Sequence, residues 1–422
     1  RLSPGTGISA MQIRNALEHD ILVPWRKQQV EQEKSALDLI HADMGGLVYQ
    51  PVTGVHGPVG ALDFISMYPS IMVRGSISPE TVDNDPLEAP PDPEGLIPRT
   101  LAPLLEKRVS LKTRQIEREL AAQRRSDKAR ASALKWLLVV CFGYLGFKNA
   151  RFGRIEAHEA VTRYGREALL RAKDTAEDLG FEVLHMYVDA LWLQKPGAAQ
   201  PEDFQPVLME IARRTGLPIS IDGVYRWVAF LPSCVDPRLP VPNRYFGAFQ
   251  DGSIKVRGLM SRRSDVPAWV AQLQMEMIAE FAKAESVDQL PDYLPAARRC
   301  LARRLGDLRA GRVPLEELLV SQRLSRELDR YRTPSPAARA AQQLAAAGRS
   351  VRPGQRVRFL HLLGQPDVHA WDLPTPIDPR RVDRARYQEL ARRAAEEVLG
   401  GLQLIETPTL FGATPGGGLQ IC

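Results

Sequence analysis

Two aspartates lie alone in apolar stretches of this sequence. Asp63 lies in ALDFISMYPSIMV (residues 61–73) and Asp189 lies in LHMYVDALWLQ (residues 184–194). Burying an unpaired carboxylate is costly, so each needs a cation or a hydrogen-bond donor. If the two stretches are neighbouring strands, the like charges repel unless a divalent cation lies between them, and two Mg²⁺ ions held by carboxylates commonly drive in-line phosphoryl transfer. The alternative is that each aspartate caps a local turn or pairs with an arginine.

A dense run of basic residues lies between Glu106 and Lys135. Ten lysines and arginines oppose four acids there, so this segment carries a net charge of +6, equal to the surplus of the whole chain. Such a run is usually the solvated face of a helix. Its concentration in one segment favours an anion-binding role.

Strands must position the two aspartates. β-branched, aromatic and aliphatic residues dominate both stretches. We predict a strand over 61–73 that ends in a turn at Pro69, and a second strand through Asp189 that ends near Gly197. Further strand-like runs follow in 218–258.

Helices and loops must position the basic run. Six prolines predict that 79–98 is a loop. Residues 99–147 read as two helices joined near 124–128, and residues 155–180 as a third helix that Gly180 closes. The tail beyond about residue 265 is largely helical, so the order of elements indicates a sheet domain with two helical appendages.

Length and composition set outer limits. The 422 residues are too many for one ordinary core, so we expect two to four domains. The mildly basic net charge of +6 permits a polyanionic partner. Four scattered cysteines lack metal-type spacing and predict reduced thiols. No apolar run of 18 residues and no signal peptide appear, so we predict no membrane span, and the start at Arg1 predicts a fragment of a longer protein.

The stretch around Asp63 resembles motif A of family B DNA polymerases, whose pattern is Asp-x-x-Ser-Leu-Tyr-Pro-Ser. This sequence matches it with Asp63, Ser66, Met67, Tyr68, Pro69 and Ser70. The resemblance implies that Asp63 is catalytic, that Asp63 and Phe64 bind metal, and that Ser66 and Met67 contact the nucleotide. It also implies that Tyr68 is a steric gate, whose ring clashes with a ribose 2′-hydroxyl and favours deoxynucleotides.

The basic run resembles the fingers of the same family. KWLLVVCFG (residues 135–143) is similar to the pattern Lys-x-x-x-Asn-Ser-x-Tyr-Gly, with Lys135 and Phe142 kept but Val139 and Val140 in place of the polar pair. LLEKRVSLK is similar to the first fingers helix and places Arg108 and Lys112 four residues apart, on one helical face. The resemblance implies that these cations and Phe142 bind the incoming nucleotide, whose β and γ phosphates need donors.

The stretch around Asp189 resembles motif C, whose pattern is Tyr-Gly-Asp-Thr-Asp-Ser-hydrophobic-aromatic. One alignment matches YVD to Tyr-Gly-Asp and loses the second acid. The other places Tyr187 at the first acid and keeps Asp189 as the second, with Leu191 and Trp192 in the tail. We prefer the second alignment, in which Asp189 is a catalytic metal ligand and Ala190 replaces the serine. Either way only one carboxylate is kept.

Later segments resemble the parts of the family that hold the primer–template duplex. NRYFG (243–247) and IKVRGLMSRRSD (254–265) are similar to the Lys-x-Tyr and Lys-Gly-x-x-x-x-Arg-Arg-Asp segments, and the tail is similar to a thumb. Phosphate contacts of this kind bind without sequence preference and weaken with salt. The implied DNA-binding residues are Arg244, Tyr245, Lys255, Arg257, Arg262 and Arg263.

The resemblance covers nearly the whole chain and begins after the point where family members carry a 3′–5′ exonuclease domain. It implies an α/β (α+β) right-hand fold with an antiparallel-sheet palm, helical-hairpin fingers and a mainly helical thumb. The expected parts are an N-terminal palm segment, fingers, a C-terminal palm segment and a thumb, at residues 1–98, 99–147, 148–262 and 263–422.

The implied function is template-directed addition of deoxynucleotides to a primer 3′-hydroxyl by two Mg²⁺ ions, with Mn²⁺ as a substitute. The departures from the motifs suggest a divergent branch with low fidelity or lesion bypass. The implied partners are primer–template DNA, deoxynucleoside triphosphates and a sliding clamp or accessory subunit, in a cytoplasmic, nucleoid-associated setting. A catalytically degenerate, DNA-binding scaffold subunit is the main alternative, and an RNA-synthesising or primase-like enzyme is a weaker one that Tyr68 disfavours.

Overall fold

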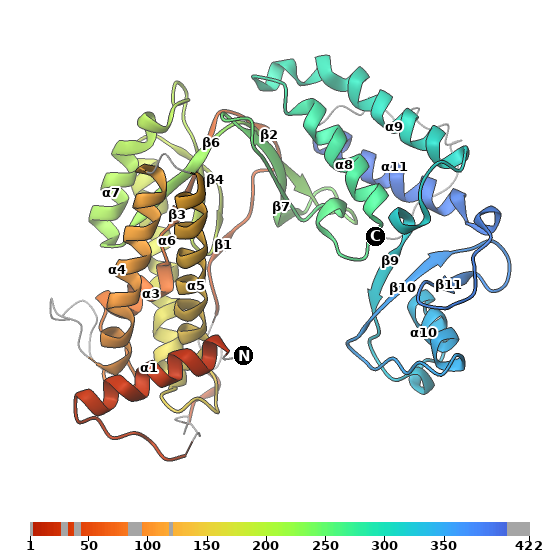
Figure 1. The fold of residues 1–422 in the computed structure, drawn as a ribbon. Coiled ribbons are helices and arrows are strands. Elements are labelled where there is room, and N and C mark those ends of the chain that lie inside the picture. The colour runs from red at the N-terminus through yellow and green to blue at the C-terminus, as the bar shows by residue number, and fades with distance from the viewer. Residues whose placement is uncertain (1–2, 27–32, 38–43, 83–94, 118–120, 403–422) are drawn as a thin grey trace. The chain divides into compact units, whose positions relative to one another are not determined.

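The computed structural model describes residues 3–26, 33–37, 44–82, 95–117 and 121–402, and only the backbone of 112–117 and 121. The chain divides into two compact units, shown in Figure 1. Unit 1 comprises Arg1–Gln50 and Gly60–Val224, and unit 2 comprises Pro51–Val59 and Tyr225–Cys422. No helix within the described part of the chain is long and apolar enough to cross a bilayer.

The sheet of unit 1 carries both aspartate stretches. Its strand order is β1-β4-β5-β3-β6, and β1, β4, β5 and β3 pair antiparallel in succession. All residues of β3 are buried except Asp63, which is half-buried. This strand is therefore apolar on both faces, and its one acid stands out. The strands are β1 (Val48–Tyr49), β4 (Glu182–Tyr187), β5 (Ala190–Gln194), β3 (Val59–Phe64) and the first part of β6 (Ile219–Pro232).

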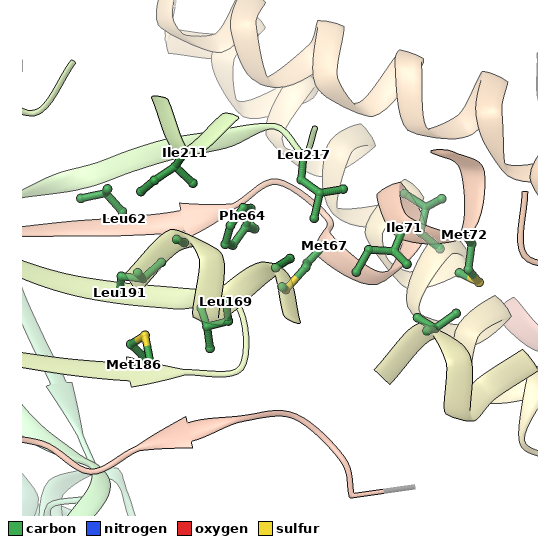
Figure 2. Packing of buried hydrophobic residues seen from close by; sticks show 14 of the residues in the cluster. Leu62, Phe64, Met67, Ile71, Met72, Leu169, Met186, Leu191, Ile211 and Leu217 are labelled. Carbon is green, nitrogen blue, oxygen red and sulfur yellow. The ribbon is translucent and has the colours of Figure 1, made fainter. Parts of the chain in front are cut away.

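The helices of unit 1 pack on this sheet and on one another. The core joins strand residues Leu62 and Leu191 to Ile71, Leu169 and Ile211 of three helices, as Figure 2 shows. In Figure 1 the long helices α4 and α5 run side by side as a hairpin. The helices are α1 (Pro4–Glu18), α3 (Met67–Arg74), α4 (Leu96–Glu117), α5 (Ala121–Leu145), α6 (Ile155–Asp178) and α7 (Gln205–Thr215).

Two predicted strands are shorter than expected. The strand predicted over 61–73 ends at Phe64, and a helix follows, because Ser66 adopts a left-handed conformation (φ 52°) that breaks the extended chain. Pro69 lies in the first turn of that helix, where a missing N–H is tolerated. The strand predicted through Asp189 is a hairpin, because Val188 turns the chain with φ of 61°. Sequence composition does not predict that turn, since a β-branched residue rarely adopts positive φ.

The helical predictions hold in part. Two helices do occupy most of 99–147, but α4 begins earlier, at Leu96, and the polar connection predicted at 124–128 lies inside α5. Its arginines and lysine are good helix formers, so polarity alone was a poor sign of a break. The helix predicted over 155–180 is confirmed as α6, and Gly180 follows it with φ of 77°. The predicted loop at 79–98 lies mostly outside the described residues.

Unit 2 has two sheets and a helical layer. The end of β6 pairs with β2 and β7, and β7 pairs with β8. A second sheet has the order β11-β10-β9 and packs against α10. The elements are β2 (Gly54–His56), β7 (Pro240–Phe249), β8 (Ile254–Arg257), α8 (Ala268–Phe281), α9 (Leu294–Arg309), β9 (Val320–Arg323), α10 (Pro336–Ala346), β10 (Arg356–His361), β11 (Val368–Ala370) and α11 (Arg384–Gly401).

The second sheet was missed by the prediction of a largely helical tail. Residues 356–359 alternate between exposed arginine and buried apolar side chains, which is the two-residue period of a half-buried strand. Short 3₁₀ turns join the larger elements: η2 (Pro201–Phe204), η3 (Met260–Arg262), η4 (Val287–Tyr293), η5 (Leu315–Leu318), η6 (Leu328–Arg330) and η7 (Pro379–Arg381). The four domain boundaries predicted from the sequence stay predictions, since the two units are defined by packing and not by role.

Candidate active site

The sheet of unit 1 brings Asp63 and Asp189 to one end of two adjacent strands. β3 and β5 are antiparallel, with Asp63 opposite Ala190. The Phe64 N–H donates to the Asp189 carbonyl oxygen at 2.8 Å. The Val188 N–H donates to the Leu47 carbonyl oxygen at 2.9 Å and ties the hairpin turn to the chain that leads into β1. Two acids that are 126 positions apart therefore meet at one site, as the prediction of neighbouring strands requires.

A pocket of about 590 Å³, counting the space open to solvent, lies over this end of the sheet. It gathers the predicted catalytic, metal-binding and nucleotide-binding residues, except Lys112, whose side chain lies outside the described residues. Its lining comprises Asp63, Phe64, Ser66, Met67, Tyr68, Pro69, Arg108, Lys135, Leu138, Val139, Phe142, Val188 and Asp189. The sequence motifs come from β3, α3, α4, α5 and the β4–β5 turn, so the pocket is assembled by tertiary packing.

The start of α3 forms one wall of the pocket. Ser66 precedes the helix in a left-handed conformation, and its side chain makes no capping hydrogen bond. Met67 and Tyr68 are the first residues of this helix, so their backbone N–H groups lie at its N-terminal end. Helix N-termini bind anions because such N–H groups and the helix dipole both favour negative charge. This wall suits the phosphates of a nucleotide.

Arg108 is one of the two cations that line the pocket. It is 6% exposed, and its Nη1 donates to the Ser66 hydroxyl. Burial lowers the pKa of the Arg108 guanidinium from its ordinary value, and the charge of Asp63 acts in the opposite direction. The Nε of Arg108 is buried without a hydrogen-bond partner among the described residues. A buried cation with an unused donor is prepared to bind an acceptor such as a phosphate oxygen.

Aromatic rings fix the position of Tyr68. Its ring centroid lies 4.5 Å from that of Phe142, and Phe142 stacks on His158 at 4.3 Å. On another side Gly165 of α6 leaves room for the ring, because a Cβ there would lie 2.8 Å from Tyr68 Cε1. The sequence motifs include neither Gly165 nor His158. A glycine inside a helix, which costs about 1 kcal/mol relative to alanine, was an available signal for the first.

The residues that depart from the family pattern differ in their exposure and in their contact with the pocket. Val139 lines the pocket and is 47% exposed, whereas Val140 packs against the core. Tyr187 ends β4 opposite Ala190 and is not part of the pocket lining. No group of three or more acidic, histidine or cysteine side chains that could hold a metal occurs among the residues the structure describes.

The donors at the site fit Mg²⁺. Asp63 and Asp189 carry carboxylates, Phe64 carries a backbone carbonyl, and all three residues line the pocket. Mg²⁺ prefers oxygen ligands, keeps several waters, and is commonly bound by one or two carboxylates together with substrate phosphates. Two carboxylates are thus sufficient for a site that a nucleotide completes, although they do not form a cage of protein ligands alone. The ligand roles of Asp63, Phe64 and Asp189 stay predictions.

The predicted DNA-binding residues of unit 2 fall into two groups. Tyr245 is 2% exposed and packs against Phe230, and the Arg244 side chain is 12% exposed and pairs with Glu397. These two side chains make contacts inside unit 2, and their DNA-binding roles stay predictions. The sequence around Arg244 and Tyr245 did not predict that both side chains are largely shielded from solvent. Arg257, Arg262 and Arg263 are exposed, and Lys255 is half-buried.

Comparison with known proteins places the chain in a family. The family model described as DNA polymerase family B matches residues 5–92, 87–191 and 242–396. DNA polymerase 2 of Saccharolobus solfataricus is 32% identical over 277 residues, which are 64% of this chain and 40% of that protein. DNA polymerase 2 of Aeropyrum pernix is 28% identical over 369 residues, which are 82% of this chain and 42% of that protein.

A solved structure agrees with these sequence matches. The family B DNA polymerase from the hyperthermophilic archaeon Pyrobaculum calidifontis superposes with a TM-score of 0.63 at 25% identity, covering 98% of this chain and 52% of that one. This chain belongs to DNA polymerase family B. It spans about half the length of the relatives it matches. The predicted fold class, mixed helices and antiparallel sheet of the family B polymerase type, is confirmed.

Proposed function

We propose that the pocket of unit 1 is the site of template-directed DNA synthesis, at which a deoxynucleotide is added to a primer 3′-hydroxyl and pyrophosphate is released. The observation that carries the proposal is the lining of the pocket, where two carboxylates, two cations and the start of a helix face one volume. A triphosphate bound with metal needs acids for the metal and cations for the phosphates in the same place. Membership of the polymerase family supports this assignment.

In this proposal the acids bind metal and the cations bind the triphosphate. Asp63 and Asp189 would hold the metal ions through their carboxylates, and Phe64 would add its carbonyl oxygen. When bound, Mg²⁺, or Mn²⁺ in its place, lowers the pKa of the attacking hydroxyl and offsets the negative charge that develops on the transferred phosphate. Arg108 and Lys135 donate charge-assisted hydrogen bonds to the triphosphate, which shields its negative charge and orients it. The first N–H groups of α3 would add donors beside Arg108, which contacts Ser66 at the start of that helix.

Tyr68 selects the sugar in this proposal. Its ring lines the pocket and is held by Phe142 on one side and Gly165 on another. A ring confined in this way cannot retreat from a ribose 2′-hydroxyl. The site is therefore proposed to use deoxynucleotides.

Low fidelity or lesion bypass is the finer part of the proposal. Val139 presents an apolar surface to the pocket at a position where the family pattern has a polar residue. An apolar wall cannot strongly reject a ligand that lacks or adds one polar group, since no protein donor is left unpaired. The test is Val139→Asn, which is expected to reduce synthesis opposite an abasic template site more than synthesis opposite a normal base. An equal effect on both templates would overturn this part.

A catalytically degenerate, DNA-binding scaffold is the second candidate. Tyr187 supports it, because a tyrosine stands where the family pattern has an acid. In either case we propose primer–template DNA as a partner. The sliding clamp or accessory subunit and the cytoplasmic, nucleoid-associated location stay predictions.

Primer extension distinguishes the two candidates. The chain is incubated with a primed template, Mg²⁺ and four deoxynucleotides, beside Asp189→Asn and the matched control Asp174→Asn, which alters an exposed acid of α6. Extension by the unmodified chain and the control, but not by Asp189→Asn, is the expected result. Absence of extension by the unmodified chain, with salt-sensitive duplex binding intact, would favour the scaffold.

A further inference from the structure

A half-buried acid lies beneath the exposed arginines of unit 2. Glu397 is on α11, and its side chain is 15% exposed. Its Oε2 accepts hydrogen bonds from the Met260 backbone N–H and from Gln274 Nε2, both at 2.9 Å, and its Oε1 accepts from Arg244 Nη2 at 2.8 Å. One carboxylate therefore joins α11 to β7, to α8 and to the 3₁₀ turn η3.

Gln274 holds the next residue of η3 in the same way as Glu397 holds Met260. It is fully buried on α8, and its Oε1 accepts from the Ser261 backbone N–H at 2.7 Å. Its Nε2 also donates to the Ala394 carbonyl oxygen at 2.9 Å. The two consecutive N–H groups that open η3, at Met260 and Ser261, are thus held by a side-chain pair anchored on two helices.

The outer side of the same turn carries charge. Arg262 and Arg263 are exposed, and the Arg263 side chain is 60% exposed. Arg263 pairs with Asp265 at 2.8 Å, which orients its guanidinium along the surface. The backbone also closes on itself, because the Arg262 and Arg263 N–H groups donate to Leu259 and Met260 carbonyl oxygens at 3.0 Å. Two adjacent cations therefore project from a backbone that is fixed from below.

The cost of this arrangement argues for a role beyond packing. Burying a carboxylate is unfavourable, and well-packed apolar residues often replace buried ion pairs without loss of stability. What an apolar residue cannot do is accept two N–H groups and fix the path of the turn. Holding a flexible arginine on a rigid backbone lowers the entropy lost when it binds an anion.

We propose that Glu397 is the positioning residue for a contact that Arg262 and Arg263 make with the phosphate backbone of duplex DNA. Glu397 does not touch the DNA and acts through η3, with Gln274 as its partner. The inference rests on the proposed function, since it assigns the duplex as the anionic ligand. It adds a residue that none of the sequence motifs contains.

Duplex binding as a function of salt tests the proposal in the whole chain. Dissociation constants for a primer–template duplex are measured by fluorescence anisotropy between about 50 and 200 mM salt. The variants are Glu397→Gln, the pair Arg262→Ala with Arg263→Ala, and all three changes together. Each lost phosphate contact should lower the slope of log affinity against log salt by about 1.

The expected pattern is one of non-additivity. Glu397→Gln lowers the salt slope towards that of the arginine pair, and it has no further effect when the arginines are already absent. The matched control is Glu276→Gln, which breaks the ion pairs of α8 with Arg303 and Arg304 but leaves η3 untouched. Gln274→Met, which removes the acceptor of the Ser261 N–H, serves as a second variant if Glu397→Gln does not fold.

The outcomes separate the inference from the proposed function. An unchanged duplex affinity and salt slope in a folded Glu397→Gln variant would overturn the inference alone. An equal loss of affinity in Glu397→Gln and in the Glu276→Gln control would do the same, since it would mark a general loss of stability. Failure of the unmodified chain to bind duplex at any salt concentration would overturn the proposed function as well.

Discussion

Replacing Arg108 with methionine should separate the stability of unit 1 from its binding of nucleotide. The guanidinium is almost fully buried, and its hydrogen bond to Ser66 leaves Nε without a partner among the described residues. Methionine has a similar length and no charge, so it fills most of the same space. The expected result is a folded protein with a weakened site.

The magnitudes follow from the contacts. A hydrogen bond to a charged group contributes about 1.5–3 kcal/mol. At 1.36 kcal/mol per factor of ten, loss of one such bond to the triphosphate lowers kcat/KM for deoxynucleotides by roughly 10- to 150-fold. Removing the buried cation ends its desolvation cost but also removes the charge that faces Asp63. These effects oppose one another, so the free energy of unfolding should change by less than about 2 kcal/mol.

Steady-state primer extension at varied deoxynucleotide concentration, together with thermal unfolding, measures both quantities. Arg99→Met is the matched control, because Arg99 is an exposed arginine of the same helix. The control should leave kcat/KM unchanged. A large fall in melting temperature with unchanged nucleotide dependence in Arg108→Met would refute the reasoning and would assign Arg108 a structural role.

Four further predictions concern Tyr68, Gly165, Cys141 and His185. Tyr68→Ala should reduce the preference for deoxynucleotides over ribonucleotides by roughly 10- to 200-fold, measured by competitive incorporation. Gly165→Ala forces a Cβ against the Tyr68 ring and should lower the free energy of unfolding by about 1–3 kcal/mol, measured by chemical unfolding. Burial raises the pKa of the Cys141 thiol to about 12, so iodoacetamide at pH 8 should label exposed Cys234 and spare Cys141 until the protein unfolds, as mass spectrometry can check. Burial lowers the pKa of His185 from 6.5 to about 4. Between these two pH values the unfolded chain binds more protons than the folded chain, so the stabilising contribution of neutral His185 is complete above pH 6.5 and is lost as the pH falls towards 4. His185→Phe should therefore flatten the dependence of the melting temperature on pH.

The two aspartates of the pocket were predictable because their chemistry conflicts with their surroundings. A lone acid in an apolar strand is unfavourable unless it binds something, and that argument needs only the local sequence. Asp63 and Asp189 were found in this way. The turn between β4 and β5 was not, because the positive φ of Val188 is imposed by the partners of the hairpin and opposes the preference of valine.

Contacts between segments that are far apart in the sequence could not be predicted from the sequence alone. Ser66 ends β3 with a left-handed conformation, yet serine has no strong preference for it, so the strand was predicted to continue. Arg244 and Tyr245 were assigned to DNA from a motif, but their burial depends on Glu397, Phe230 and the packing of unit 2. Only the structure shows that Arg244 pairs with Glu397, an acid more than a hundred positions later in the sequence.

We propose that Asp63 and Asp189 act as one metal-binding unit, and a double-mutant cycle tests this proposal most directly. Single-turnover primer extension is measured in Mg²⁺ for Asp63→Asn, Asp189→Asn and both changes together, with Asp174→Asn as the control. Each single change is expected to slow the reaction by roughly 10³-fold or more. The double change is expected to be no slower than the slower single one, because residues that act as a unit are not additive. Rate losses that multiply in the double variant, or an Asp189→Asn protein that extends primers at the normal rate, would contradict it.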